Sequence, residues 1–87
     1  MFTIPNFQLV QPLYDSENTS VSRAIRRVDQ QPVILKWLKA DFPTATQLAH
    51  YRQEYELLSQ FHLPGVIQAY SLEQWQDHPI LVLEDIG

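Results

Sequence analysis

The strongest constraint on the fold is a change in the spacing of apolar residues along the chain. Residues 44–61 contain no proline or glycine, and their apolar side chains recur at helical spacing. These side chains are Leu48, Tyr51, Tyr55, Leu58 and Phe61. Thr44 and Gln47 fit a capping box at the start of this segment. We therefore expect one amphipathic helix, ended by the Pro and Gly stop signals in residues 62–65.

The segments on either side of this helix have the pattern of short strands. Three expected strands precede the helix, at residues 7–14, 21–28 and 33–38, and two follow it, at residues 66–75 and 80–83. Polar or proline-containing turns separate most neighbouring strands, so hairpins should dominate and the sheet should be antiparallel. We expect an α+β fold in which a five-stranded antiparallel sheet carries one packed helix.

Composition excludes several classes of protein. The chain has 87 residues, a net charge of −4 and no cysteine. The lack of cysteine excludes disulfides and thiolate metal sites, and no cluster of Lys or Arg approaches a nucleic-acid footprint. No apolar run reaches the roughly 20 residues of a membrane span, and the first residues do not resemble a signal peptide. We expect a cytoplasmic chain with no metal site, no nucleic-acid partner and no membrane span.

Two charged residues stand where apolar side chains are expected. Lys36 interrupts the apolar strand 33–38, which should be covered on both faces, and Glu54 lies on the helix stripe of Tyr51 and Leu58. An isolated buried charge is very costly, whereas a paired one is tolerable. Two solutions remain open: the two side chains pair between strand and helix, or each extends its charged end to water.

Glu56 is the rival partner for Lys36. It lies about 200° around the helix from Glu54, at roughly 3.6 residues per turn, so it should face away from the apolar stripe. On that side it could pair with Arg52, which precedes it at the i, i+4 spacing.

A strand lysine paired with a helix glutamate resembles the arrangement with which protein kinases hold the α- and β-phosphates of ATP. V-I-L-K, ending at Lys36, resembles the kinase V-A-I-K strand, and Val21 stands where the family has the valine that closes its Gly-rich loop. The run L-L-S-Q-F-H-L-P-G-V-I after Glu54 is similar to the kinase segment leading through H-P-N-I-V into the fourth strand. I-L-V-L-E-D-I-G resembles the fifth strand and hinge.

The resemblance covers residues 7–87 and rests on the ordered set of motifs, since no single motif is specific. It implies that residues 1–87 form one partial domain, the N-terminal lobe of a serine/threonine-type protein kinase in signal transduction, ending at the hinge. The detailed sequence is similar to the kinase lobe of large bacterial hybrid serine/threonine–histidine kinases. The partners implied are ATP and a kinase C-terminal lobe or other downstream domains, with Mg²⁺ only if that lobe is present.

The resemblance also implies a role for each matching residue. Lys36 would contact the phosphates and Glu54 would orient it. The adenine pocket would be lined by Val21, Leu13 and Ile34, with Leu83 as gatekeeper, and the backbone of Glu84 and Ile86 would bond the adenine edge. Ile34 replaces the small alanine of the family motif and should narrow this pocket.

The chain departs from the family pattern in its loop and in its length. The Gly-rich frame falls on Tyr14, Ser16 and Thr19, whose side chains obstruct the close approach of backbone to phosphate. Asp15 and Glu17 add negative charge at the same place. The H-R-D and D-F-G motifs do not occur in the sequence, so it contains no kinase catalytic residue.

Three interpretations of the chain follow from these observations. The first is an ATP-binding lobe that transfers no phosphoryl group by itself. The alternative is a non-enzymatic degenerate lobe that acts as a scaffold or interaction module, which the lost glycines favour. The third is an unrelated small α+β domain, which would not bring Lys36 and Glu54 within ion-pair distance.

Overall fold

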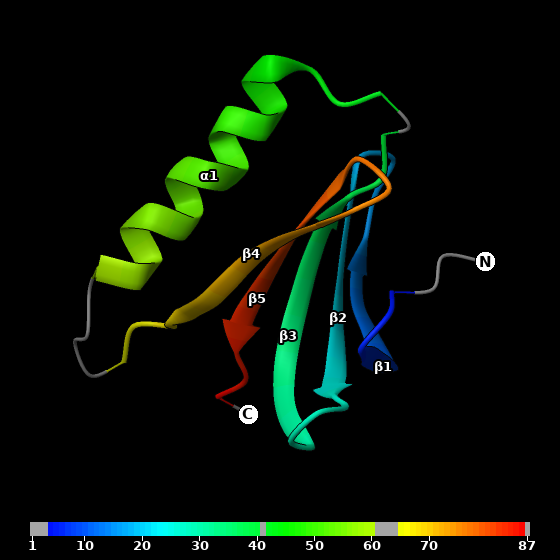
Figure 1. Cartoon of the computed structure of the whole chain (residues 1–87), viewed down its shortest axis with the longest axis vertical. Helices are drawn as coiled ribbons and strands as arrows, with labels where there is room; N and C mark the ends of the chain where they lie inside the picture. Colours follow the sequence, from blue (N-terminus) through cyan, green and yellow to red (C-terminus); the bar gives the residue numbers. More distant parts are fainter. Residues whose placement is uncertain (1–3, 41, 61–64, 87) are drawn as a thin grey trace.

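In the computed structural model, which describes residues 4–40, 42–60 and 65–86, a helix lies across one face of a curved sheet (Figure 1). The elements are β1 (Phe7–Asp15), β2 (Thr19–Arg26), β3 (Gln31–Leu38), α1 (Ala45–Gln60), β4 (Ala69–Trp75) and β5 (His78–Glu84). The strands lie side by side in the order β1-β2-β3-β5-β4, and all neighbouring pairs are antiparallel. The expected α+β class, with a five-stranded antiparallel sheet and one helix in the described part of the chain, is confirmed.

Tight turns explain why consecutive strands pair as hairpins. Gln76 and Asp77 join β4 to β5, and their φ angles are 48° and 67°. Two successive positive φ angles are typical of a type I′ turn, whose twist matches that of the paired strands. In the turn between β2 and β3, Gln30 has a φ of 58° and the carboxylate of Asp29 accepts a hydrogen bond from the Gln31 amide at 3.2 Å. Both turns thus fix the register of the strands that they connect.

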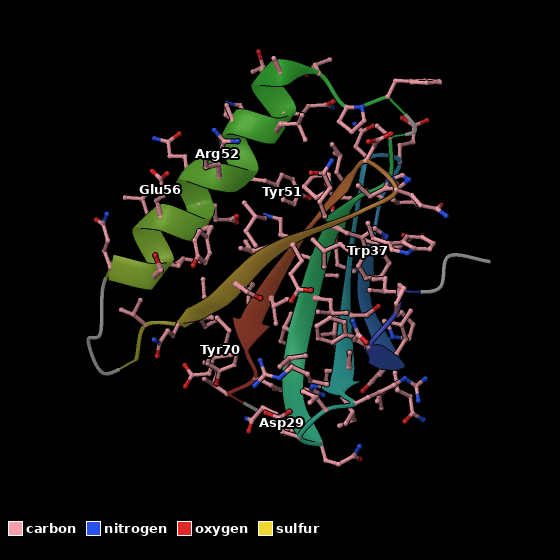
Figure 2. All side chains as sticks on the ribbon, in the orientation of Figure 1. Asp29, Trp37, Tyr51, Arg52, Glu56 and Tyr70 are labelled. Atoms are coloured by element: carbon pink, nitrogen blue, oxygen red, sulfur yellow. The ribbon has the colours of Figure 1, made fainter. Side chains whose placement is uncertain are left out.

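One face of the sheet curls over its own core. The buried side chains on this face are Ile4, Phe7, Ala24, Val33, Leu35, Trp37, Ile80 and Val82. The guanidinium carbon of Arg26 in β2 lies 5.6 Å from the ring centre of Tyr70 in β4, although β3 and β5 separate these two strands. The sheet therefore bends until side chains near its two edges meet. Trp37 lies in this core (Figure 2), and the partly buried Trp75 packs against it.

The helix covers only part of the opposite face. Leu38, Tyr51, Ala69 and Leu81 form a buried cluster between α1 and the sheet. Tyr51 is the buried residue of the helix, and α1 contacts β4 and β5. β1 and β2 lie away from the helix at the other edge of the sheet (Figure 1). In the described part of the chain, no helix is long and apolar enough to cross a membrane.

The start of the helix has the expected capping box. The Gln47 amide donates to Oγ1 of Thr44 at 3.1 Å, and the Thr44 amide donates to Oε1 of Gln47 at 2.9 Å. Two amide donors that the helix leaves without an internal acceptor are thereby satisfied. The expected end of the helix at Phe61, and most of its stop signal at residues 62–65, lie outside the described residues.

Several expected strand boundaries were wrong. Val28 is not in β2, which ends at Arg26, but in the following turn, where it is 85% exposed. The fourth strand does not begin at Val66 but at Ala69, after Gly65 with its φ of 83°.

The expectation for the third and fifth strands also needed correction. β5 extends one or two residues beyond residues 80–83 at each end, because the two-residue turn allows pairing from Trp75 and His78 onward. β3 is fully buried on one face only. Its other face, which carries Ile34 and Lys36, is half-buried because the helix covers it incompletely.

We expect the curled face to supply most of the stability. Leu35 is fully buried there, so Leu35→Ala should lower the free energy of unfolding by about 2–5 kcal/mol. Leu57 in α1 is 49% exposed, and the matched change Leu57→Ala should alter it by less than about 0.5 kcal/mol. Urea unfolding of both variants measures the difference. Equal losses would contradict this placement of the core.

Candidate functional site

An ion pair connects the sheet to the helix. Nζ of Lys36 in β3 lies 2.9 Å from Oε1 and 3.0 Å from Oε2 of Glu54 in α1. About one third of each side chain is exposed, at 32% and 33%. Glu56 is exposed, on the side of α1 away from the sheet (Figure 2). Of the two solutions that the sequence left open, the structure has the pairing of Lys36 with Glu54, and the rival Glu56 is not the partner.

Tyr51 supports this pair from the preceding turn of the helix. Its ring centre lies 5.6 Å from Nζ of Lys36, a distance at which an aromatic face attracts a cation. Tyr51 points toward the sheet (Figure 2), and it precedes Glu54 by three residues, a spacing that places both side chains on the same face of the helix. The sequence pattern placed Tyr51 on the apolar stripe, but its contact with Lys36 was not predicted.

The hydroxyl of Tyr51 is buried and has no hydrogen-bond partner among the described residues. Burial raises the pKa of this phenol because the charged form loses its hydration, and nearby Thr19 and Lys36 oppose the rise. Thr19 forms no hydrogen bond with the Tyr51 hydroxyl, so it affects the pKa of the phenol only as a polar neighbour. The phenol therefore stays neutral beyond its ordinary titration range.

A cleft of about 530 Å³ lies beside the ion pair, over the part of the sheet that the helix leaves uncovered. Nine residues line it: Tyr14, Ser16, Thr19, Val21, Ile34, Lys36, Glu54, Ile67 and Leu83. Val21 is the register partner of Lys36, and Ile34 is the partner of Leu83, which places all four side chains on one face of the sheet. The cleft is thus apolar at one end and charged at the other.

The cleft brings together five of the eight residues predicted to bind a nucleotide: Val21, Ile34, Lys36, Glu54 and Leu83. Leu13 is 45% exposed and is not among the lining residues. Ile86 is 65% exposed and also lies outside the lining. The Glu84 amide donates to the carbonyl of Gln68 at 2.8 Å, so this donor is already used.

The structure adds one apolar residue that the sequence argument missed. Ile67 lines the cleft from the segment just before β4. The available signal was its place at the end of L-P-G-V-I, which had been assigned to a strand and not to a pocket. Ile67 lies in the chain segment that follows α1, and its side chain bounds the cleft together with Glu54 of α1.

Two further ion pairs lie near the cleft. Asp15, expected to repel a phosphate, lies 2.9 Å from Nζ of Lys39, and this hydrogen bond holds the pKa of its carboxyl below the usual range. Near the end of β5, Arg23 of β2 reaches Asp85, with Nε 3.4 Å from Oδ2. Neither Lys39 nor Asp85 was predicted to take part in the site.

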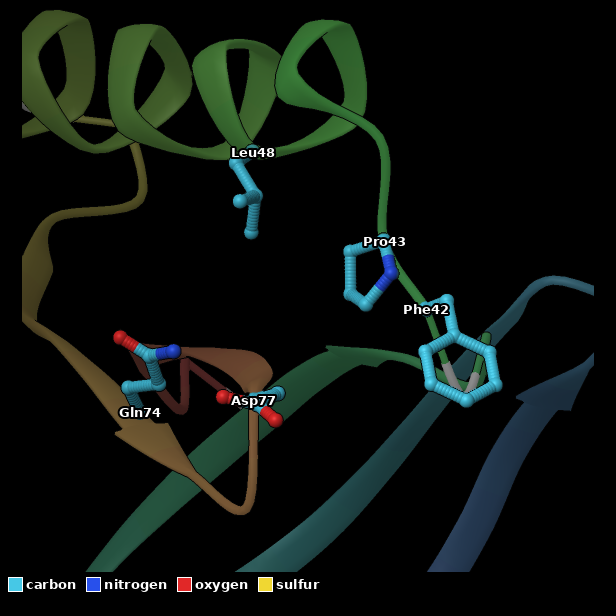
Figure 3. Close-up of a pocket in the computed structure, with 5 residues that line it drawn as sticks. All are labelled: Phe42, Pro43, Leu48, Gln74 and Asp77. Atoms are coloured by element: carbon cyan, nitrogen blue, oxygen red, sulfur yellow. The ribbon is translucent and has the colours of Figure 1, made fainter.

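Two smaller hollows lie between the first half of the helix and the β4–β5 hairpin. One, of about 240 Å³, is lined by Phe42, Pro43, Leu48, Gln74 and Asp77 (Figure 3). The other has the same volume and shares Leu48 and Gln74 with it. Neither contains the ion pair, so the 530 Å³ cleft is the stronger candidate for a charged or polar ligand.

Comparison with known proteins does not assign the chain to a family. It matches no protein-family model, and no match is found among curated proteins.

Removing the Tyr51 hydroxyl tests whether it lacks a partner. We expect Tyr51→Phe to leave the free energy of unfolding unchanged or to raise it by about 1 kcal/mol, because a buried hydroxyl without a hydrogen bond is unfavourable. Tyr55→Phe, at a half-buried position of the same helix, is the control. A loss above about 1 kcal/mol in urea unfolding, specific to Tyr51→Phe, would mean that the hydroxyl is bonded.

Proposed function

We propose that this chain is a nucleotide-binding lobe of the protein-kinase type, and that the 530 Å³ cleft takes adenosine or its phosphates. One observation carries the proposal. The cleft combines an apolar end of suitable size with a strand lysine held by a helix glutamate, and these residues stand in the order of the kinase motifs. Ligand sites generally have such an apolar lining with a few convergent polar groups.

The apolar end suits a flat aromatic base. Ile34 and Leu83 are register partners in β3 and β5, and Val21 of β2, which is diagonal to Ile34, completes a row of three apolar side chains that ends beside Lys36. Ile67 adds a fourth apolar side chain from the segment before β4. In this proposal the base packs against the row of three, and its burial supplies the main part of the binding free energy.

The charged end can bond a ligand without losing its internal pair. A lysine ammonium has three donors and no acceptor. Glu54 engages Lys36 through its two carboxylate oxygens, at 2.9 and 3.0 Å, and so occupies at most two of these donors. At least one N–H of Lys36 is left for an oxygen atom of the ligand.

Nucleotide titration tests the proposal. We expect saturable binding of adenine nucleotides to the full chain, followed by isothermal titration calorimetry or by NMR shifts. Lys36→Ala should weaken ATP binding about tenfold or more, since a hydrogen bond to a charged group contributes roughly 1.5–3 kcal/mol. The control Arg27→Ala removes the same charge at an exposed turn and should have little effect. Equal weakening by both variants, in chains that remain folded, would contradict the proposed contact.

We also expect no phosphoryl transfer by the chain itself. Positioning groups and bound metal ions supply nearly all of phosphoryl-transfer catalysis, and the sequence contains neither H-R-D nor D-F-G. A radiolabelled phosphate assay with the isolated chain and a generic protein substrate should remain at background. Turnover that disappears in Lys36→Ala would overturn this expectation and make the chain an enzyme.

A further inference from the structure

The turn between β1 and β2 closes on itself. The Ser16 amide donates to the Thr19 carbonyl at 2.9 Å, and the Thr19 amide donates to Oγ of Ser16 at 3.1 Å. The Ser16 hydroxyl also donates to the Thr19 carbonyl at 3.2 Å. The amides that this turn might direct at an anion are therefore engaged inside the turn at both of these residues.

A lysine fastens the same turn to the end of β3. Nζ of Lys39 donates to Oδ1 of Asp15 and to the carbonyl of Ser16, both at 2.9 Å. The Lys39 amide donates to the carbonyl of Asn18 at 2.7 Å. We call this set of three bonds the Lys39 latch. It joins both backbone and side chain of the turn to one residue, so the turn is held in a single position.

The latched turn stands at the charged end of the cleft. Tyr14, Ser16 and Thr19 line the cleft, and Thr19 is two residues from Val21, the register partner of Lys36. Both lysines near this end already have a carboxylate partner within 3.0 Å, namely Glu54 and Asp15. The charged end therefore offers hydroxyl groups and compensated charges, while the amides of Ser16 and Thr19 are engaged within the turn.

We infer that the cleft recognises the nucleoside part of an adenine nucleotide, gains little from the β- and γ-phosphates, and owes this preference to the Lys39 latch. The inference rests on the proposed function and specifies its ligand class. Ribose hydroxyls are neutral and can bond both carboxylate and hydroxyl groups, so they fit the charged end as it stands. A triphosphate needs unpaired positive charge or free amides to replace its hydration.

Comparing ligands of increasing charge tests this preference. Adenosine, AMP and ATP, the last with and without Mg²⁺, are titrated into the full chain at one ionic strength. We expect the dissociation constants of adenosine and ATP to agree within about threefold, because attraction to paired, partly exposed charges is screened. ATP binding more than about tenfold tighter than adenosine would overturn the inference and leave the proposed function standing. Failure of all three ligands to bind would overturn both.

A matched pair of variants tests the role of the latch. Asp15→Asn removes the carboxylate that Lys39 holds and leaves its ammonium without that partner beside the turn. ATP affinity should then rise about fivefold while adenosine affinity stays constant, as expected for one charge acting close to a phosphate. Glu17→Gln makes the same change of net charge at an exposed position of the same turn and should raise ATP affinity less than twofold because of screening. Equal effects of the two variants would overturn the assignment of the preference to the latch.

Discussion

The contact between Lys36 and Glu54 connects the helix to β3 beside the candidate cleft. The helix has one buried side chain, Tyr51, and this side chain packs against the same lysine. A pair that is one third exposed stabilises a fold by no more than about 1 kcal/mol, so the helix is held mainly by its apolar cluster against β4 and β5. Because the cleft is bounded by β3 on one side and α1 on the other, its width depends on this pair.

The two faces of the sheet differ: one face holds the larger buried core, and the other face carries the candidate cleft. The curled face holds the larger cluster of fully buried side chains, including Val33, Leu35 and Val82, and needs no helix to cover it. The opposite face is covered by a helix that packs mainly against β4 and β5. Regions with fewer buried contacts open at lower free energy than the core. The candidate site thus lies where a well-packed sheet meets a lightly packed helix.

What the sequence could predict depended on local patterns and on the cost of burying charge. Hydrophobic period and turn residues located all six elements, and the cost of an unpaired buried charge led from Lys36 to Glu54. The contact of Asp15 with Lys39 left no such signal, since both side chains are partly exposed and 24 residues separate them. Val28 was wrongly assigned to the second strand because a β-branched residue next to a strand end gives the same sequence pattern whether it lies in the strand or in the turn.

The departures from the kinase pattern form one consistent arrangement. Ser16 and Thr19 stand where the family has glycine, and the amide and hydroxyl of Ser16 bond the backbone of Thr19, so the amides of these two residues are engaged within the turn. A turn of this kind needs another element to hold it, and Lys39 does so from the end of β3. Since Lys36 keeps at least one free N–H, the same cleft can still bind an oxygen atom of a ligand. In the proposed nucleotide-binding lobe, this turn would therefore not act as a phosphate cradle, and the rest of the proposed site would not depend on it.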